Sequence, residues 1–348
     1  MVVDDSTVMR AMLTRVVGED PVSMEVVAQA VNGQAAVERA RKGDIDVIVL
    51  DIEMPVMDGL TALPLLLAIM PRPVVIMAST LTTRNADISL RALAAGAKDY
   101  VPKPSSVTPG GGLQDFKREL LEKIRTLGNR YRRAFRPQQD LAVKAGLPPL
   151  KLRPPSMARP GAVAIGSSTG GPTALMHVLK AIPAPAPVPI FITQHMPPTF
   201  TRMLAENLQR ETKHVCAEAI EGEVVSAGRV YLAPGDYHMC VELSGGKSVI
   251  RLNQNERENF CRPSVDPMLR SLVPIYTRGL LVAILTGMGQ DGLIGCEKVV
   301  ANGGTVFAQD EESSVVWGMP GAVAKAGVCA SVAPLQKLGP EIARLVGR

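Results

Sequence analysis

The chain has 348 residues, of which 46% are hydrophobic and 20% charged, and it carries a formal net charge of +5 at pH 7. At roughly 150 residues per domain, this length predicts about two globular domains and excludes a disordered chain. Aromatic residues make up only 3% of the chain, which argues against a base-stacking surface for single-stranded nucleic acid.

The absence of long apolar runs and of a secretory leader pattern predicts a cytoplasmic protein that is not integral to the membrane. Acidic residues stand at positions 4 and 5, where a signal peptide would be basic. The cysteines are scattered, odd in number and without metal-ligand spacing, as in reduced cytosolic proteins. They are Cys216, Cys240, Cys261, Cys296 and Cys329.

The first part of the chain alternates aliphatic runs with helical patterns, which predicts an α/β fold with a doubly wound parallel sheet. The predicted strands are 1–3, 47–50, 74–78 and 99–101, and helical patterns cover 6–17 and 113–127. Only three residues precede Asp4, so we expect a short first strand and a weakened sheet.

Polar residues stand at the carboxyl ends of these strands, where parallel sheets hold their ligands. They are Asp4, Asp5, Asp51, Ser79 and Lys103. Taken singly, the first two aspartates could cap a helix, Asp51 could begin a turn and Lys103 could be a solvated loop residue. Together, three carboxylates on one sheet edge would repel unless a divalent cation such as Mg²⁺ neutralised them.

The motifs VVDDS, DIEMPVMDGL, MAST and KP in residues 1–125 resemble those of response-regulator receiver domains, which have a flavodoxin-like fold. The resemblance implies that Asp51 accepts a phosphoryl group from a histidine kinase. It further implies Mg²⁺ bound by Asp4, Asp5, Asp51 and the backbone carbonyl of Glu53. Ser79 would follow the phosphoryl group, and Lys103 would form its ion pair.

A basic, proline-rich segment separates the two halves. Between Arg125 and Arg159, nine basic residues stand against one acidic residue, Asp140. We interpret residues 126–158 as a solvated linker. The alternative is a contact surface for an acidic partner.

After the linker, three aliphatic runs each end at a residue typical of nucleophilic catalysis. Residues 162–165 lead to the serines of GSSTGG, 188–193 lead to His195, and 279–285 lead to Asp291. In parallel strands these side chains would emerge at one sheet edge, where the histidine could activate a serine and the carboxylate could orient the imidazole. The alternatives for His195 are a core histidine or a metal ligand, although no metal-ligand spacing accompanies it.

Six motifs in residues 159–348 resemble those of chemotaxis protein-glutamate methylesterases, among them IGSSTGGP, ITQHMPPTF, RPSVDPM and LTGMGQDG. The resemblance implies a mostly parallel, doubly wound α/β hydrolytic domain. In it Ser168 is the nucleophile, His195 the base, Asp291 the orienting acid and the Met288 N–H an oxyanion donor. The implied substrates are glutamate methyl esters, and specific glutamines, on the cytoplasmic helices of methyl-accepting chemoreceptors. No cofactor is implied for the hydrolysis, and phosphorylation of the receiver would control it.

Two residues and one function stay open at this stage. Trp317 could line a substrate groove or belong to the core, and Asp266 could be an active-site or a turn residue. The rival function is a receiver that drives a nucleic-acid-binding output through the basic linker. The C-terminal half has no helix-turn-helix signature or arginine-rich helix, so we expect no nucleic-acid partner.

Overall fold

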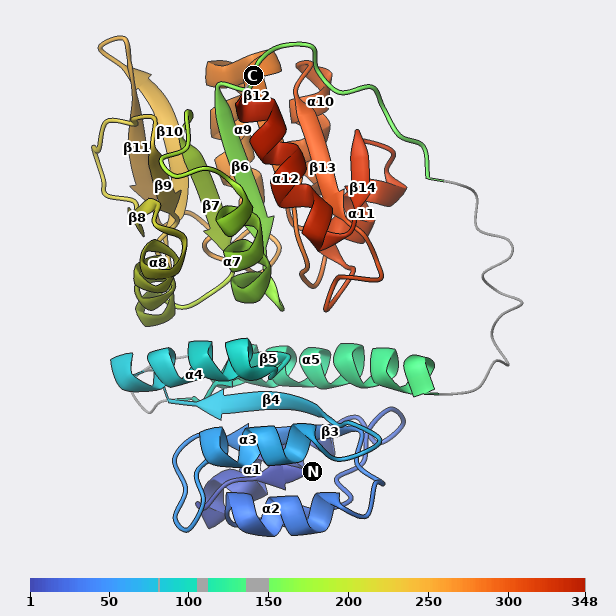
Figure 1. The fold of residues 1–348 in the computed structure, drawn as a ribbon. Coiled ribbons are helices and arrows are strands. Elements are labelled where there is room, and N and C mark those ends of the chain that lie inside the picture. The colour runs from blue at the N-terminus through green and yellow to red at the C-terminus, as the bar shows by residue number, and fades with distance from the viewer. Residues whose placement is uncertain (81, 105–111, 136–149, 348) are drawn as a thin grey trace. The chain divides into compact units, whose positions relative to one another are not determined.

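A computed structural model describes residues 1–80, 82–104, 112–135 and 150–347. The chain divides into two compact units, residues 1–147 and 148–348, which we call the N-terminal and the C-terminal unit. Both units have the predicted α/β fold with a parallel sheet (Figure 1).

The N-terminal unit is built on a parallel sheet with strand order β2-β1-β3-β4-β5, the flavodoxin-like order. The strands are β1 (Val2–Val3), β2 (Gln29–Ala30), β3 (Val47–Asp51), β4 (Val74–Ser79) and β5 (Asp99–Pro102). The first strand is short, as expected, yet it pairs with both β2 and β3 and is buried. The strand β2 was not predicted, because its two residues form no recognisable aliphatic run.

Helices α1 (Thr7–Val17), α2 (Gly33–Ala40), α3 (Gly59–Leu67), α4 (Thr83–Ala95) and α5 (Gly112–Phe135) complete this unit. The first helix begins after Ser6, whose hydroxyl accepts the Met9 N–H, so the two aspartates before it are not its N-cap.

The last of these helices, α5, runs eight residues beyond the predicted end at residue 127. Its apolar stripe continues through the buried Tyr131, and Arg132 forms an ion pair with Asp46 at 2.7 Å. The first ten residues of the predicted linker are therefore helical. Residues 136–149, which hold two of the linker's seven basic residues and three of its five prolines, lie outside the described part of the chain.

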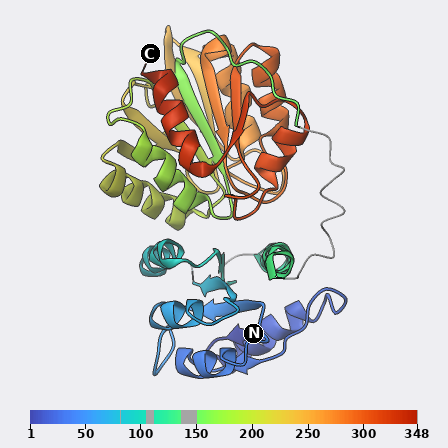
Figure 2. The same cartoon turned by 45° about the vertical axis from the view of Figure 1, so that its right-hand side comes forward.

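The C-terminal unit has a seven-stranded parallel sheet with the order β14-β13-β12-β6-β7-β9-β8. Its strands are β6 (Ala162–Ser167), β7 (Ile190–Gln194), β8 (Val215–Glu218), β9 (Arg229–Leu232), β12 (Leu280–Ile284), β13 (Thr305–Gln309) and β14 (Ser331–Ala333). The three predicted strands, β6, β7 and β12, are adjacent in the middle of the sheet (Figure 2). All three are fully buried, which explains their unbroken aliphatic character.

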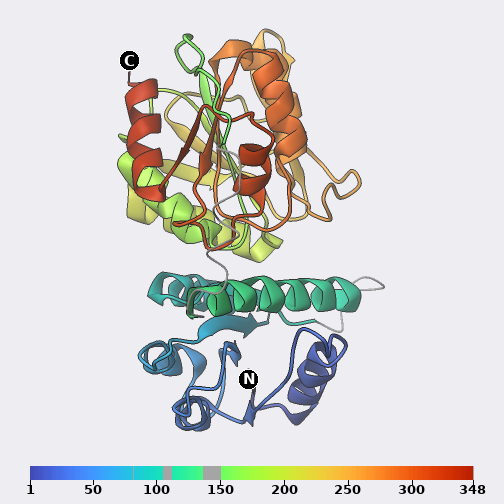
Figure 3. The ribbon, with the colours of Figure 1, turned by 90° about the vertical axis from the view of Figure 1, so that its right-hand side faces the viewer.

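Helices cover both faces of this sheet, as Figure 3 shows, with α12 and α7 on one side and α10 on the other. The helices are α7 (Gly171–Ala181), α8 (Pro198–Thr212), α9 (Val265–Tyr276), α10 (Leu293–Ala301), α11 (Met319–Lys325) and α12 (Leu335–Val346). An antiparallel hairpin, β10 (His238–Ser244) with β11 (Lys247–Asn253), packs against α9. Within the described ranges, no helix is long and apolar enough to cross a membrane.

Candidate functional sites

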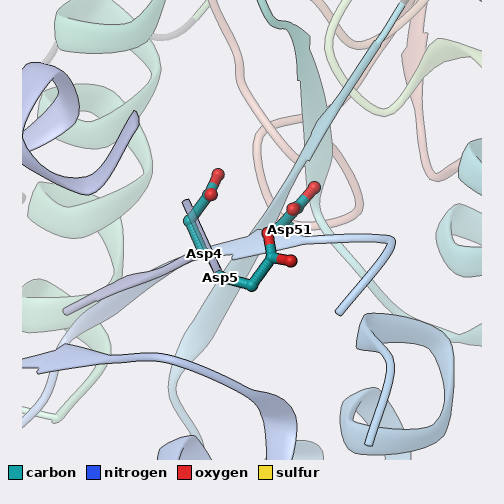
Figure 4. A group of neighbouring side chains, drawn as sticks. All are labelled: Asp4, Asp5 and Asp51. Atoms are coloured by element: carbon teal, nitrogen blue, oxygen red, sulfur yellow. The ribbon is translucent and has the colours of Figure 1, made fainter. Parts of the chain in front are cut away.

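In the N-terminal unit, three carboxylates gather at the carboxyl ends of β1 and β3. Ligand atoms of Asp4, Asp5 and Asp51 lie within 4.8 Å of one another (Figure 4). Asp4 follows β1 and Asp51 ends β3, and the pairing of these two strands brings the acids together. Asp4 and Asp51 are buried, whereas Asp5 is exposed.

Lys103 joins this acidic cluster from the residue after β5. Its Nζ lies 2.7 Å from Asp4 Oδ2 and 2.6 Å from Asp51 Oδ1. Ser79, at the end of β4, is buried and its Oγ accepts a hydrogen bond from Ser89 Oγ at 3.1 Å. In this structure, therefore, Lys103 contacts the acids. The Ser79 hydroxyl does not contact them and is hydrogen-bonded to Ser89 instead.

The acidic cluster has the chemistry of a site for a hard divalent cation. Carboxylate oxygens are the ligands that Mg²⁺ prefers, and three of them converge here. Glu53 adds no carboxylate, because its side chain contacts Arg84 and Asn85 instead. The Glu53 backbone carbonyl remains a predicted ligand of the cation.

The pKa of Asp51 is raised from its usual value. Burial is the main cause, and the neighbouring charge of Asp4 adds to it. Hydrogen bonding and attraction from Lys103, together with the Ile52 N–H at 2.8 Å, offset only part of this effect. The donors to this carboxylate among the described residues are Lys103 Nζ and the Ile52 N–H.

In the C-terminal unit, the three predicted catalytic residues emerge at one edge of the sheet. Ser168 follows β6, His195 follows β7, and Asp291 lies in the loop between β12 and α10. Since β12, β6 and β7 are adjacent and parallel, their carboxyl ends meet. His195 Nε2 lies 2.7 Å from Asp291 Oδ2, so the predicted histidine–aspartate pair is present in the geometry.

Asp291 is buried and receives hydrogen bonds from the start of α9 and the loop before it. The donors are Ser264 Oγ (2.7 Å), Val265 N (2.6 Å), Asp266 N (3.2 Å) and Asn259 Nδ2 (3.1 Å). Burial alone would raise the pKa of Asp291, but His195 and these donors lower it. The carboxylate is therefore ionised and fixed against the imidazole.

The loop after β12 lies directly against Ser168. The Ser168 N–H donates to Thr286 O at 3.0 Å, and a Cβ on Gly287 would lie 2.9 Å from Ser168 Cβ. Only glycine permits this approach. The next residue is Met288, whose backbone N–H makes no hydrogen bond to any described residue.

The two adjacent serines differ in their surroundings. Ser167 is fully buried, and its Oγ donates to Gln194 Oε1 at 2.7 Å. Gln194 Nε2 donates in turn to the Ser168 carbonyl at 2.9 Å. A Cβ on Gly171 would lie 1.9 Å from Gln194 Oε1, so this glycine makes room for the glutamine. The Ser167 side chain therefore holds Gln194, which in turn bonds the backbone of the loop. Ser168 is half-buried at the edge of the sheet.

The second nitrogen of the His195 ring faces Cys261, for which the sequence predicted no role in the site. Nδ1 lies 3.4 Å from Cys261 Sγ, and no hydrogen bond joins the ring to Ser168 Oγ among the described residues. Burial lowers the pKa of His195, but Cys261 and Asp291 outweigh it and raise this pKa from 6.5 to about 10. In this arrangement the imidazole holds its proton at neutral pH.

The structure also places the two residues whose interpretation stayed open. Asp266 lies in the first turn of α9, where its carboxylate accepts from Gly295 N at 2.6 Å and from Asn259 Nδ2 at 3.2 Å. Burial and the charge of Asp291 raise its pKa. Trp317 packs against the hydrophobic core, and its indole N–H donates to Gln309 O at 2.9 Å. Neither side chain contacts His195 in the described part of the chain.

Two family models match the chain, one over each unit. The model for the response regulator receiver domain matches residues 1–108, and that for CheB methylesterase matches residues 163–342.

Curated relatives match over the full length. The chain is 52% identical to the protein-glutamate methylesterase/protein-glutamine glutaminase of Azospirillum brasilense, covering 100% of this chain and 92% of the relative. It is 51% identical to a protein of the same description from Paramagnetospirillum magneticum, covering 100% and 96%. Among solved structures, the CheB methylesterase catalytic domain of Thermotoga maritima matches with a TM-score of 0.52 and 41% identity, covering 54% of this chain and all of that domain.

Proposed function

The chain belongs to the CheB methylesterase family and is a protein-glutamate methylesterase/protein-glutamine glutaminase with a receiver domain, and from this premise we propose how its residues act. We propose that Ser168, His195 and Asp291 hydrolyse γ-glutamyl methyl esters on the cytoplasmic helices of methyl-accepting chemoreceptors. The observation that carries this proposal is the His195–Asp291 contact beside Ser168, at the ends of three adjacent parallel strands.

The proposed reaction begins with proton transfer from Ser168 to His195. Because Asp291 holds Nε2, the nitrogen that accepts this proton is Nδ1. The contact from Ser168 to Nδ1 forms when substrate binds, since catalytic hydrogen bonds tighten in the substrate complex. The serine oxygen then attacks the ester carbonyl, and the Met288 N–H donates to the oxyanion that develops.

Collapse of the tetrahedral intermediate completes the chemistry. His195 gives its proton to the departing methoxide, which leaves as methanol, and Ser168 keeps the glutamyl group as an ester. Water, activated by the same imidazole, then releases glutamate. A glutamine side chain passes through the same intermediate and releases ammonia, which accounts for both activities in the family's description.

The N-terminal unit supplies the control in this proposal. Asp51 accepts a phosphoryl group from a chemotaxis histidine kinase, and Asp4, Asp5, Asp51 and the Glu53 carbonyl would hold Mg²⁺. The cation would supply positive charge that offsets the phosphoryl oxygens. Lys103 already contacts Asp51 and would pair with the added charge, while Ser79 would leave Ser89 to donate to the phosphoryl group.

The hydrolytic proposal can be tested by replacing Ser168, with replacement of the adjacent Ser167 as the matched control. Purified chain is incubated with methyl-labelled receptor, and volatile methanol is counted. Ser168→Ala should lower the rate by about 10⁴-fold or more, because the nucleophile is lost. Ser167→Ala should lower it far less, since the Ser167 hydroxyl contacts Gln194 rather than the substrate. An active Ser168→Ala variant would refute the proposed nucleophile.

A further inference from the structure

Cys261 lies beside the proposed base, yet the proposed hydrolysis does not use it. Its Sγ is 3.4 Å from His195 Nδ1, and the other side of the ring is held by Asp291 at 2.7 Å. The three titratable side chains therefore form a continuous row, sulfur to imidazole to carboxylate. Because Nδ1 is also the nitrogen that Ser168 needs, any change at the sulfur acts directly on the base.

The loop that carries Cys261 is held firmly in place. Asn259 and Phe260 adopt left-handed φ angles of 51° and 63°, which ordinary residues keep only when neighbouring contacts hold them. Those contacts are present, because Asn259 Nδ2 donates to Asp291 and the Cys261 N–H donates to Glu258 O at 2.9 Å. After the cysteine, Arg262 pairs with Asp236 at 2.7 Å.

Cys261, the residue that carries this thiol, is also partly exposed to solvent. Its neighbour Phe260 is 71% exposed. Three of the other cysteines are buried, and the remaining one, Cys240, is partly exposed like Cys261. Cys240 Sγ contacts Pro267 O at 3.8 Å and Asn253 Nδ2 at 3.7 Å, with no imidazole beside it. Cysteines that are partly exposed next to a positive imidazolium are the reactive ones in proteins, so the two thiols should differ.

Building on the proposed function, we propose that Cys261 is an oxidisable thiol, and that a hydroperoxide switches off hydrolysis by converting it to a sulfenic acid. The thiolate sulfur attacks one oxygen of the peroxide, so an S–O bond forms as the O–O bond breaks. Sulfur is oxidised and the peroxide is reduced. The proton of the His195 imidazolium goes to the departing hydroxide, which leaves as water.

Oxidation of Cys261 blocks His195 because the added oxygen lies next to the ring nitrogen that Ser168 needs. The sulfenic oxygen is added at the atom that faces Nδ1, where its hydroxyl can hydrogen-bond to the ring. Nδ1 can then no longer accept the proton of Ser168. Two equivalents of a small thiol restore the enzyme, because they reduce the sulfenic acid to the thiol and are themselves oxidised to a disulfide, with release of water.

Peptide labelling of the full-length chain tests the reactivity of the thiol without any measurement of hydrolysis. The reduced protein is treated with iodoacetamide, or with hydrogen peroxide followed by a 1,3-dicarbonyl trap, and each cysteine peptide is quantified by mass. Cys261 should react at least about tenfold faster than Cys240, and His195→Ala should remove this difference. Equal rates for the two thiols, or rates unaffected by His195→Ala, would overturn the proposal.

The activity arm compares each variant with itself before and after hydrogen peroxide. Methanol release should stop in the parent chain and in Cys240→Ala, and dithiothreitol should restore it. Cys261→Ala and Cys261→Ser should keep their own starting rates after treatment, and equal loss in these variants would contradict the switch. If the untreated parent releases no methanol, the proposed function fails, while the labelling arm still decides whether Cys261 is reactive.

Discussion

Asp51 and Asp291 are both buried aspartates at the carboxyl end of a central parallel strand, but their pKa values move in opposite directions. Asp51 receives one backbone N–H and lies beside Lys103. Asp291 receives four hydrogen bonds from the start of α9 and its preceding loop, in addition to His195. Burial opposes the charge at both sites. At Asp291 the contact with His195 and the donors around α9 outweigh burial, whereas at Asp51 Lys103 and the Ile52 N–H do not, and the charge of Asp4 adds to it.

This difference matches what each carboxylate has to do in the proposed function. A carboxylate that accepts a phosphoryl group needs an oxygen that is not already saturated with donors. A carboxylate that orients an imidazole needs the opposite, because its position and its charge must not change during the reaction. The comparison also makes opposite predictions for the same chemical change, from aspartate to asparagine, at the two sites.

The largest expected effect is on hydrolysis in Asp291→Asn. The amide cannot stabilise an imidazolium as a carboxylate does, and it can present an N–H to Nε2, so the rate should fall by about 10⁴-fold. Asp266→Asn is the control, since Asp266 lies next to Asp291 but does not contact His195. Its effect on the rate should be much smaller. Equal losses in the two variants would show that Asp291 has no special role.

The next effect concerns phosphodonor stimulation in Asp51→Asn. A stimulation of about 100-fold would need only about 2.7 kcal/mol of difference between two forms of the enzyme. The variant should lose all of it, because no phosphoryl acceptor remains, and should keep its unstimulated rate. Asp44→Asn serves as the control, since Asp44 is an exposed acid paired with Arg39. Methanol release is measured with and without a small phosphodonor, and stimulation that survives Asp51→Asn would disprove the assignment.

A graded effect, spread over several pH units, is the pH dependence of hydrolysis. An imidazolium cannot accept the Ser168 proton, and the pKa of His195 is raised to about 10. Below that value the rate should rise roughly tenfold per pH unit, the slope for loss of one proton. Cys261→Ala removes one of the groups that raise this pKa and should move the profile to lower pH. A profile that is flat from pH 7 to 10 would contradict this protonation state.

The smallest effect is on stability, and its sign should differ between the two sites. The raised pKa of Asp51 means that its charge destabilises the fold above that pKa, so Asp51→Asn should raise the melting temperature of the N-terminal unit. The pKa of Asp291 is lower in the folded than in the unfolded protein, so its charge stabilises the fold at pH values above the pKa of the unfolded state. This stabilisation is lost as the pH falls through the pKa of the folded state. Asp291→Asn should therefore cost about 2 kcal/mol. Calorimetry at neutral pH measures both, and shifts of equal sign would refute the comparison.

Local patterns were enough to predict the parallel sheet of the N-terminal unit and three of the seven strands in the C-terminal sheet, whose parallel order was implied by the family resemblance. Unbroken aliphatic runs such as those of β3 and β12 indicate strands buried on both faces, and the polar residue that follows each run marks the edge where a site forms. The elements that were not predicted include the two-residue β2 and the hairpin β10–β11, and also β13, although it is fully buried.

The sequence predicted that the residues after these three strands meet at one edge only on the condition that the strands are parallel, and their order in the sheet was not predicted. Ser168, His195 and Asp291 converge because the tertiary fold makes β12, β6 and β7 neighbours, and strand order depends on long-range packing rather than on local periodicity. The same holds for Asn259, Cys261 and Ser264, whose loop precedes α9 and reaches the site from outside the three strands. Their residue types are ordinary, so only the folded chain shows that they surround His195 and Asp291.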